Sequence, residues 1–175
     1  VGRIRTRGAH VMLRYLNLPA QTREAVVGGW LYPGDLGFMD AEGELSFVAR
    51  CSERINTGGE KVFASEVEAA LLKHPLVKQA AAFGVPHARL GDAVAAALVL
   101  HHPPPHNRGS GGGGKEEEQA QTKALLTAHC RSLLSPFKIP RVLCIWPEAE
   151  LPSNPAGKIM KGQIRDYVMA QRSKL

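Results

Sequence analysis

The sequence predicts an α+β protein, in which a short mixed sheet with packed helices follows a β-rich segment. Two observations predict this class. Strand-like runs at residues 30–38 and 44–50 flank a turn at 40–43, which is typical of a β-hairpin. After Arg50, apolar runs of strand length alternate with segments of helical periodicity.

The segment before the hairpin is expected to hold one strand and one short helix. Residues 1–7 alternate as a strand does. Residues 19–27 have a helical pattern, which Gly28 and Gly29 are expected to stop.

A helix is expected at residues 65–74, because Glu68 follows Ser65 by three residues ahead of an apolar run and Pro75 comes after it. This spacing predicts a capping box. The other expected elements are strands at 77–85 and 93–100, a helix at 116–134, a strand at 141–146 and a helix at 160–171. The strands at 77–85 and 93–100 are rich in alanine, so periodicity alone leaves a helix open for them.

The long helix is expected to bury one face. That face comprises Leu125, Leu126, Cys130, Leu133 and Leu134. Before it, residues 101–115 are interpreted as a flexible insertion of Pro, His, Asn, Gly and Ser. Residues 109–115 have the spacing of a phosphate loop, but Glu116 stands where Ser or Thr would hold magnesium. His101, His102 and His106 lie in the same insertion, so no ordered metal site is expected from them.

Composition excludes several classes of function. The net charge is +6, but Lys and Arg are scattered and aromatic residues are few, which argues against nucleic-acid binding. No apolar run approaches the roughly 20 residues of a membrane span. Three cysteines, an odd number without metal-type spacing, indicate a reducing compartment and no disulfides.

Three motifs occur in one order along the chain. They read G-W-L-Y-P-G-D at residues 29–35, A-R-C-S-E-R-I-N-T-G-G-E at 49–60 and L-P-S-N-P-A-G-K at 151–158. In this order they resemble the motifs of the acyl-adenylate-forming (AMP-binding) enzymes, in the acyl-CoA ligase branch. Those motifs read G-W-x-x-T-G-D, G-R-x-x-D-x-I-x-x-G-G-E and L-P-x-T-x-S-G-K. The resemblance covers residues 2 to about 167.

The resemblance implies a division of the chain. Residues 1–50 are expected to be the C-terminal end of the large catalytic domain, and residues 51–175 the small C-terminal lid domain. The phosphate loop and most of the acid pocket are then expected before Val1, which would make the chain part of a longer protein.

The resemblance also implies nucleotide-binding residues. Asp35 matches the carboxylate that binds the ribose, and Arg50 matches an arginine that contacts the nucleotide. Without the resemblance, Asp35 is interpreted as a turn-stabilising residue and Arg50 as part of a surface salt bridge. Ser52 falls at the hinge between the domains, where the family has Asp or Lys. Pro33 replaces a Thr, so a hydroxyl contact is not expected there.

Lys158 matches the lysine that neutralises charge while a carboxylate and ATP form an acyl-adenylate and pyrophosphate. Gly58, Gly59 and Glu60 match the turn that lines the CoA channel when acyl-CoA and AMP form. The lid is expected to swing between the two steps. The alternatives are a surface lysine and an ordinary hairpin turn.

ATP, Mg²⁺ and CoA are the cofactors implied, with Mg²⁺ and most ATP contacts in the missing domain. Four runs are most similar to plant and algal 2-succinylbenzoate–CoA ligases of phylloquinone synthesis: H-P-L-V at 74–77, R-L-G-D at 89–92, H-C-R at 129–131 and F-K-I-P-R at 137–141. The alternatives are a 4-coumarate-ligase-like peroxisomal enzyme for a fatty or oxylipin acid, and a truncated chain without catalysis.

Ser173, Lys174 and Leu175 match a peroxisomal address, which would make the peroxisomal import receptor a partner. The alternative is a basic helix that happens to end in these residues. A plastid location would require a signal upstream of Val1.

Overall fold

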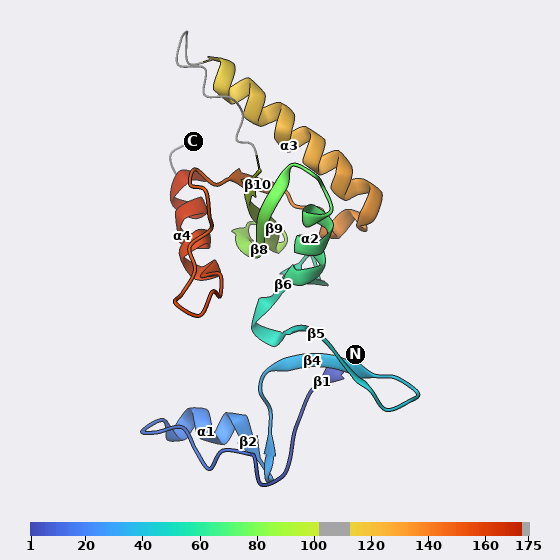
Figure 1. Ribbon diagram of the computed structural model, residues 1–175, viewed down its shortest axis with the longest axis vertical. Coiled ribbons are helices and arrows are strands. Elements are labelled where there is room, and N and C mark those ends of the chain that lie inside the picture. Colours follow the sequence, from blue (N-terminus) through green and yellow to red (C-terminus); the bar gives the residue numbers. More distant parts are fainter. Residues whose placement is uncertain (102–112, 173–175) are drawn as a thin grey trace. The chain divides into compact units, whose positions relative to one another are not determined.

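The computed structural model describes residues 1–101 and 113–172. The chain divides into two compact units, Val1–Glu53 and Arg54–Leu175 (Figure 1). The functional boundary expected between residues 50 and 51 stays a prediction.

The first unit is built around the expected hairpin. Strands β4 (Asp35–Met39) and β5 (Leu45–Arg50) pair antiparallel, and β1 (Gly2–Arg3) pairs with the other edge of β4. The register of β4 on β5 shifts between Leu36 and Gly37. The hairpin prediction is therefore confirmed.

Three details of the first unit differ from the sequence prediction. Helix α1 (Pro19–Ala25) ends early, because Gly28 and Gly29 turn the chain with φ of 58° and 79° and let β2 (Val26–Val27) pair with β3 (Trp30–Leu31). The strand expected at 30–38 is interrupted before Asp35, where Pro33 lacks a backbone donor and Gly34 has φ of 84°. The strand expected at 1–7 is reduced to β1 and a bridge from Thr6 to Leu31.

The second unit holds a mixed five-stranded sheet. Its order is β10-β9-β6-β7, and β8 pairs with β9. The strands are β6 (Arg54–Thr57), β7 (Glu60–Phe63), β8 (Val77–His87), β9 (Gly91–Leu100) and β10 (Val142–Ile145). Only the β10–β9 pairing is parallel, so the predicted short mixed sheet is confirmed.

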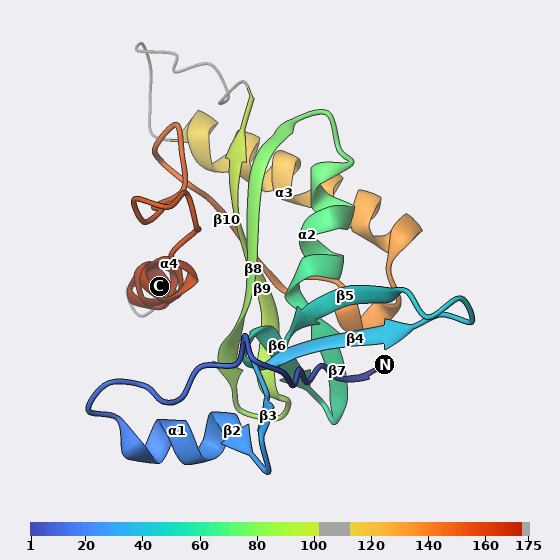
Figure 2. The same ribbon diagram turned by 60° about the horizontal axis from the view of Figure 1, so that its bottom comes forward.

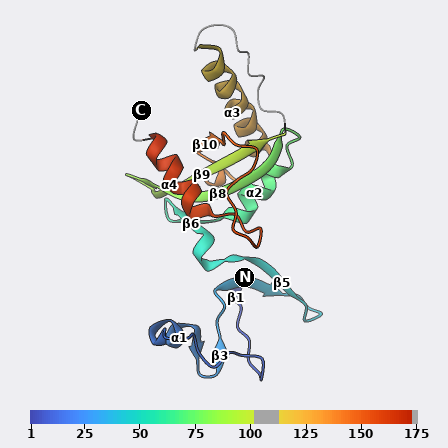
Figure 3. The ribbon, with the colours of Figure 1, turned by 60° about the vertical axis from the view of Figure 1, so that its left-hand side comes forward.

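Helices cover both faces of this sheet (Figures 1 and 3). Helix α2 (Ala64–Leu72) and helix α3 (Gly113–Leu133) contribute to one apolar core, and α4 (Lys161–Arg172) contributes to the other. Alternate alanines of β9 enter the two cores: Ala96 lies in the first, and Ala95 and Ala97 lie in the second. The alanine-rich strands are therefore buried on both faces, which explains their continuous apolar sequence.

The prediction of a capping box at Ser65 and Glu68 is wrong. Helix α2 begins at Ala64 with Phe63 as its N-cap, and no side chain caps it. Since the helix starts before Ser65, Glu68 is not in position to close a box. The Glu68 carboxylate instead accepts a hydrogen bond from the backbone N–H of Ala82, at 2.8 Å.

The apolar face predicted for α3 is correct in part. Leu126 and Cys130, four residues apart, are fully buried, and Leu134 packs partly buried beside them. Leu125 and Leu133 are 50% and 45% exposed, because they lie to the side of the stripe that faces the sheet. Burial raises the pKa of the Cys130 thiol.

Two histidines join α3 to the end of α2. A ring nitrogen of His129, Nε2, is 3.0 Å from the carbonyl oxygen of Ala70, one of the last carbonyls of α2. The rings of His129 and His74 meet edge to face at 4.9 Å. Burial, with a smaller contribution from His129, lowers the pKa of His74.

The adjacent residues Leu71 and Leu72 allow a test of this packing. Leu71 is fully buried, whereas Leu72 is 48% exposed. We expect Leu71→Ala to reduce the free energy of unfolding by about 2–5 kcal/mol, because it leaves a cavity between α2 and the sheet. Leu72→Ala is the matched control and should cost less than about 1 kcal/mol. Urea unfolding followed by circular dichroism measures both, and equal losses would contradict the packing described.

Candidate functional site

Asp35 and Arg50 face each other across the hairpin. Asp35 opens β4, Arg50 closes β5, and the two are register partners. The Arg50 Nε lies 3.3 Å from Asp35 Oδ1, and the side chains are 50% and 21% exposed, respectively. Asp35 Oδ1 is buried and lacks a hydrogen bond among the described residues. The structure thus brings together the two residues predicted to contact the nucleotide.

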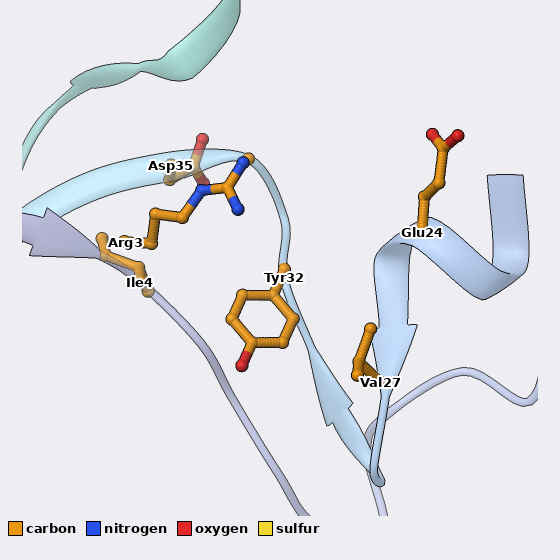
Figure 4. A pocket seen from close by; sticks show the side chains of 7 residues that line it. Arg3, Ile4, Glu24, Val27, Tyr32 and Asp35 are labelled. Carbon is orange, nitrogen blue, oxygen red and sulfur yellow. The ribbon is translucent and has the colours of Figure 1, made fainter.

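A cavity of about 330 Å³ opens beside Asp35 within the first unit. Arg3, Tyr32 and Asp35 line this cavity, and in Figure 4 the Tyr32 hydroxyl points away from the Asp35 carboxylate. Glu24 of α1 lies across the cavity from them. The lining thus includes a carboxylate, a guanidinium and a phenol, groups that can bind a ligand with several hydroxyl groups.

Gly58 and Gly59 form the two-residue turn between β6 and β7. Their φ angles are 58° and 87°, which is the geometry that a tight hairpin requires. The Gly58 N–H donates to the carbonyl of Leu90 at 2.9 Å, and a Cβ at Gly58 would lie 3.2 Å from the Leu90 side chain. A Cβ at Gly59 would meet nothing within 4 Å, and Glu60 after it is exposed. The turn therefore presents bare backbone.

Lys158 lies in a small loop before α4. The loop is closed by a bridge between Ser153 and Ile159 and by a hydrogen bond from the Met160 N–H to the Pro152 carbonyl, at 2.8 Å. Lys158 is exposed on this loop. Its position allows the ammonium group to meet an anionic ligand from outside the unit.

Comparison with known proteins identifies the family. The family described as AMP-binding enzyme C-terminal domain matches residues 66–158. The chain belongs to the AMP-binding enzyme C-terminal domain family.

The named relatives of this chain are CoA ligases. It is 36% identical to the 2-succinylbenzoate–CoA ligase, chloroplastic/peroxisomal, of Arabidopsis thaliana, over 97% of this chain and 31% of that protein. It is 34% identical to the oxalate–CoA ligase of the same plant, over 96% of this chain and 29% of that protein. The chain thus spans about a third of the length of these relatives.

A solved structure has the same fold. The o-succinylbenzoate CoA synthetase of Bacillus subtilis, in complex with its acyl-adenylate intermediate, superposes with a TM-score of 0.77 at 33% identity. The match covers 94% of this chain and 30% of that enzyme. The same enzyme has also been solved in complex with ATP and magnesium ion.

Asn154 shapes the lysine loop, a role that the sequence interpretation missed. Its Oδ1 accepts hydrogen bonds from the backbone N–H groups of Ala156 and Lys158, at 3.1 and 2.9 Å. In the third motif, Asn154 stands where the family pattern L-P-x-T-x-S-G-K has Thr. The signal was available, because an asparagine ahead of Pro155 and Gly157 is typical of a turn closed by its own side chain.

The remaining predicted residues are placed as follows. Ser52 lies exposed in a short 3₁₀ turn, Cys51–Glu53, at the end of the first unit. The targeting residues Ser173, Lys174 and Leu175, and most of the insertion with His102 and His106, lie outside the described residues.

Within residues 1–101 and 113–172, no group of three or more His, Cys, Asp or Glu is arranged to hold a metal ion. No helix in those ranges is long and apolar enough to cross a membrane. The roles of the site residues stay predictions.

The Gly58 turn can be tested against another glycine of the same unit. We expect Gly58→Ala to reduce the free energy of unfolding by about 1–3 kcal/mol, since it places a side chain at positive φ against Leu90. Gly162 lies in α4 with nothing within 4 Å of an added Cβ, so Gly162→Ala is the control and should be neutral or stabilising. Urea unfolding compares the two, and a Gly58→Ala chain as stable as the parent would contradict this turn geometry.

Proposed function

We propose that this chain is the C-terminal part of an ATP-dependent acid–CoA ligase. Such an enzyme joins a carboxylate to ATP, giving an acyl-adenylate and pyrophosphate, and then transfers the acyl group to CoA with release of AMP. The observation that carries the proposal is the family match over residues 66–158, which extends from α2 to the lysine of the exposed loop. CoA ligases among the relatives support it.

In the first step, the Asp35 carboxylate accepts hydrogen bonds from the ribose hydroxyls. The Asp35 side chain is 21% exposed, and a carboxylate has lone pairs beyond those that face Arg50. The Arg50 guanidinium, half exposed, keeps donors for an oxygen of the nucleotide while it holds Asp35 in place. Both side chains therefore bind ATP at its ribose.

Lys158 acts in the same step, at the reacting α-phosphate of ATP. The carboxylate and the α-phosphate are both anions, and pyrophosphate carries further negative charge away. An ammonium group stabilises the charge that develops between them. The exposed loop delivers it, and Asn154 holds the loop backbone from inside.

Magnesium is implied by the family but does not fit this chain. Among the described residues no cluster of acidic or histidine side chains is arranged to hold a metal ion. We expect the large domain of a longer protein to bind the magnesium ion.

In the second step, the Gly58–Gly59 turn replaces the lysine loop. We infer that the second unit turns about Ser52 between the two steps, as the resemblance implies. The bare backbone of Gly59 then lines the path of the pantetheine arm of CoA, where a side chain would obstruct it. One site is used for both reactions.

For the acid, we propose 2-succinylbenzoate. Support comes from the names of the Arabidopsis relative at 36% identity and of the Bacillus subtilis enzyme. The oxalate–CoA ligase at 34% identity is the strongest competing indication. The name of the Arabidopsis relative, chloroplastic/peroxisomal, likewise supports a peroxisomal or plastid location.

The acid can be identified with the full-length protein. We expect pyrophosphate exchange into ATP to depend on 2-succinylbenzoate, with kcat/KM at least about 100-fold above that for oxalate or a long-chain fatty acid. The reason is that a pocket built for an aromatic keto-diacid leaves polar groups unpaired with either competitor. A preference for oxalate would overturn the proposed acid while leaving the reaction class intact.

Lys158 can be tested by separating the two steps. In the full-length protein, Lys158→Ala should reduce acid-dependent pyrophosphate exchange by about 100-fold or more, because the charge that stabilises adenylation is lost. CoA transfer from a supplied acyl-adenylate should change by less than about threefold. Lys73→Ala, which removes an exposed lysine at the end of α2, is the matched control and should affect neither step. Equal loss of both steps would contradict the role given to Lys158.

A further inference from the structure

Helix α2 carries two glutamates on either side of the buried Val67, and each makes an ion pair. Glu66 pairs with Lys138 of the short helix Pro136–Lys138, with Nζ to Oε1 at 2.6 Å. Glu68 pairs with Lys161 at 2.8 Å, and the same oxygen, Oε1, accepts the Ala82 N–H at 2.8 Å. The two glutamates are thus similar in chemistry but tied to different parts of the unit.

The Glu68 pair joins elements from opposite faces of the sheet. Helix α2 packs in one core and α4, which begins at Lys161, packs in the other (Figure 2). Strand β8 runs between the two helices and pairs with β9 along one edge. The Ala82 N–H of β8 donates its hydrogen bond to Glu68 instead of to β9. The contact therefore passes the edge of the sheet at β8.

The partial burial of the Glu68–Lys161 ion pair strengthens its contribution to stability. The Glu68 and Lys161 side chains are only 19% and 23% exposed, so solvent screens them less than a surface pair. Lys161 is the first residue of α4, where the helix dipole disfavours a cation. A carboxylate at 2.8 Å offsets that cost, so Glu68 contributes to holding Lys161 at this position.

The same pair stands at the base of the lysine loop. Lys161 follows Met160 directly, and the Met160 N–H closes the loop on Pro152. The other leg is fixed by the side chain of Gln79 in β8, whose Oε1 accepts the N–H of the buried Leu151 at 2.8 Å. The two ends of the loop are therefore held near β8 by side chains. Gln79 of β8 holds Leu151, and Glu68 of α2 holds Lys161.

We propose that Glu68 is a positioning residue for Lys158. By holding Lys161 it fixes the C-terminal leg of the loop and so the direction in which the loop presents its ammonium group. This inference rests on the proposed function of Lys158. Glu68 lies on α2, separated from the Gly58–Gly59 turn by β7, so the proposal assigns it no role in the second step.

Amide hydrogen exchange tests the contact without any assay of function. In the 175-residue chain, Glu68→Gln keeps an acceptor for Ala82 but removes the charge that holds Lys161. We expect exchange at Lys158 and Met160 to accelerate about tenfold relative to amides of β9. Glu66→Gln, on the same helix, is the matched control and should leave those amides unchanged. Equal exchange in both variants would overturn the proposal.

Half-reactions of the full-length protein test the positioning role. Glu68→Gln should slow acid-dependent pyrophosphate exchange about tenfold through kcat, while CoA transfer from supplied acyl-adenylate changes less than about twofold. Lys161→Gln should do the same, and the double variant should be no slower than either single one. Glu66→Gln should affect neither step.

Equal loss of both steps in Glu68→Gln, or additive losses in the double variant, would show a general structural role and overturn the proposal. A parent enzyme without any pyrophosphate exchange would instead overturn the proposed function. In that case the amide-exchange comparison would still decide whether Glu68 holds the loop.

Discussion

The second unit depends on burying β9 from both sides. Every residue of β9 from Ala93 to Leu100 is buried, and helices from both layers contribute to the cores on its two faces. Small side chains let helices approach a sheet closely, so the alanines of β8 and β9 set the thickness of the unit. The segments with candidate functions all lie outside this centre. They are the Gly58–Gly59 turn, the loop that carries Lys158 and the edge of β8.

Much of this architecture could be predicted from local sequence. The hairpin around residues 40–43, the buried strands and the amphipathic helices follow from periodicity and turn residues. The failures occur where pairing or a contact with another segment, near or distant in sequence, decides the conformation. Val26 and Val27 join a strand because Trp30 and Leu31 offer one to pair with, and Glu68 contacts Ala82 and Lys161 rather than its own helix end.

The candidate site was predictable in its residues more than in its geometry. Motif resemblance selected Asp35, Arg50 and Lys158, but it contained nothing about how they are held. Counting residues around the hairpin would not have placed Asp35 opposite Arg50, because the register shifts between Leu36 and Gly37. Gln79 was missed because only the folded chain brings its side chain to the Leu151 N–H, whereas the contacts of Asn154 are local and its turn pattern was readable from the sequence.

The bond from the Gly58 N–H to the Leu90 carbonyl joins the β6–β7 turn to the turn between β8 and β9. These two turns are distant in sequence, yet the conformation of either one constrains the other. For chimeras made from related ligases, this sets a practical rule for choosing exchange points. Residues 87–91 should be transplanted together with residues 57–60, because a donor turn paired with a foreign recipient would lose the shared backbone contact.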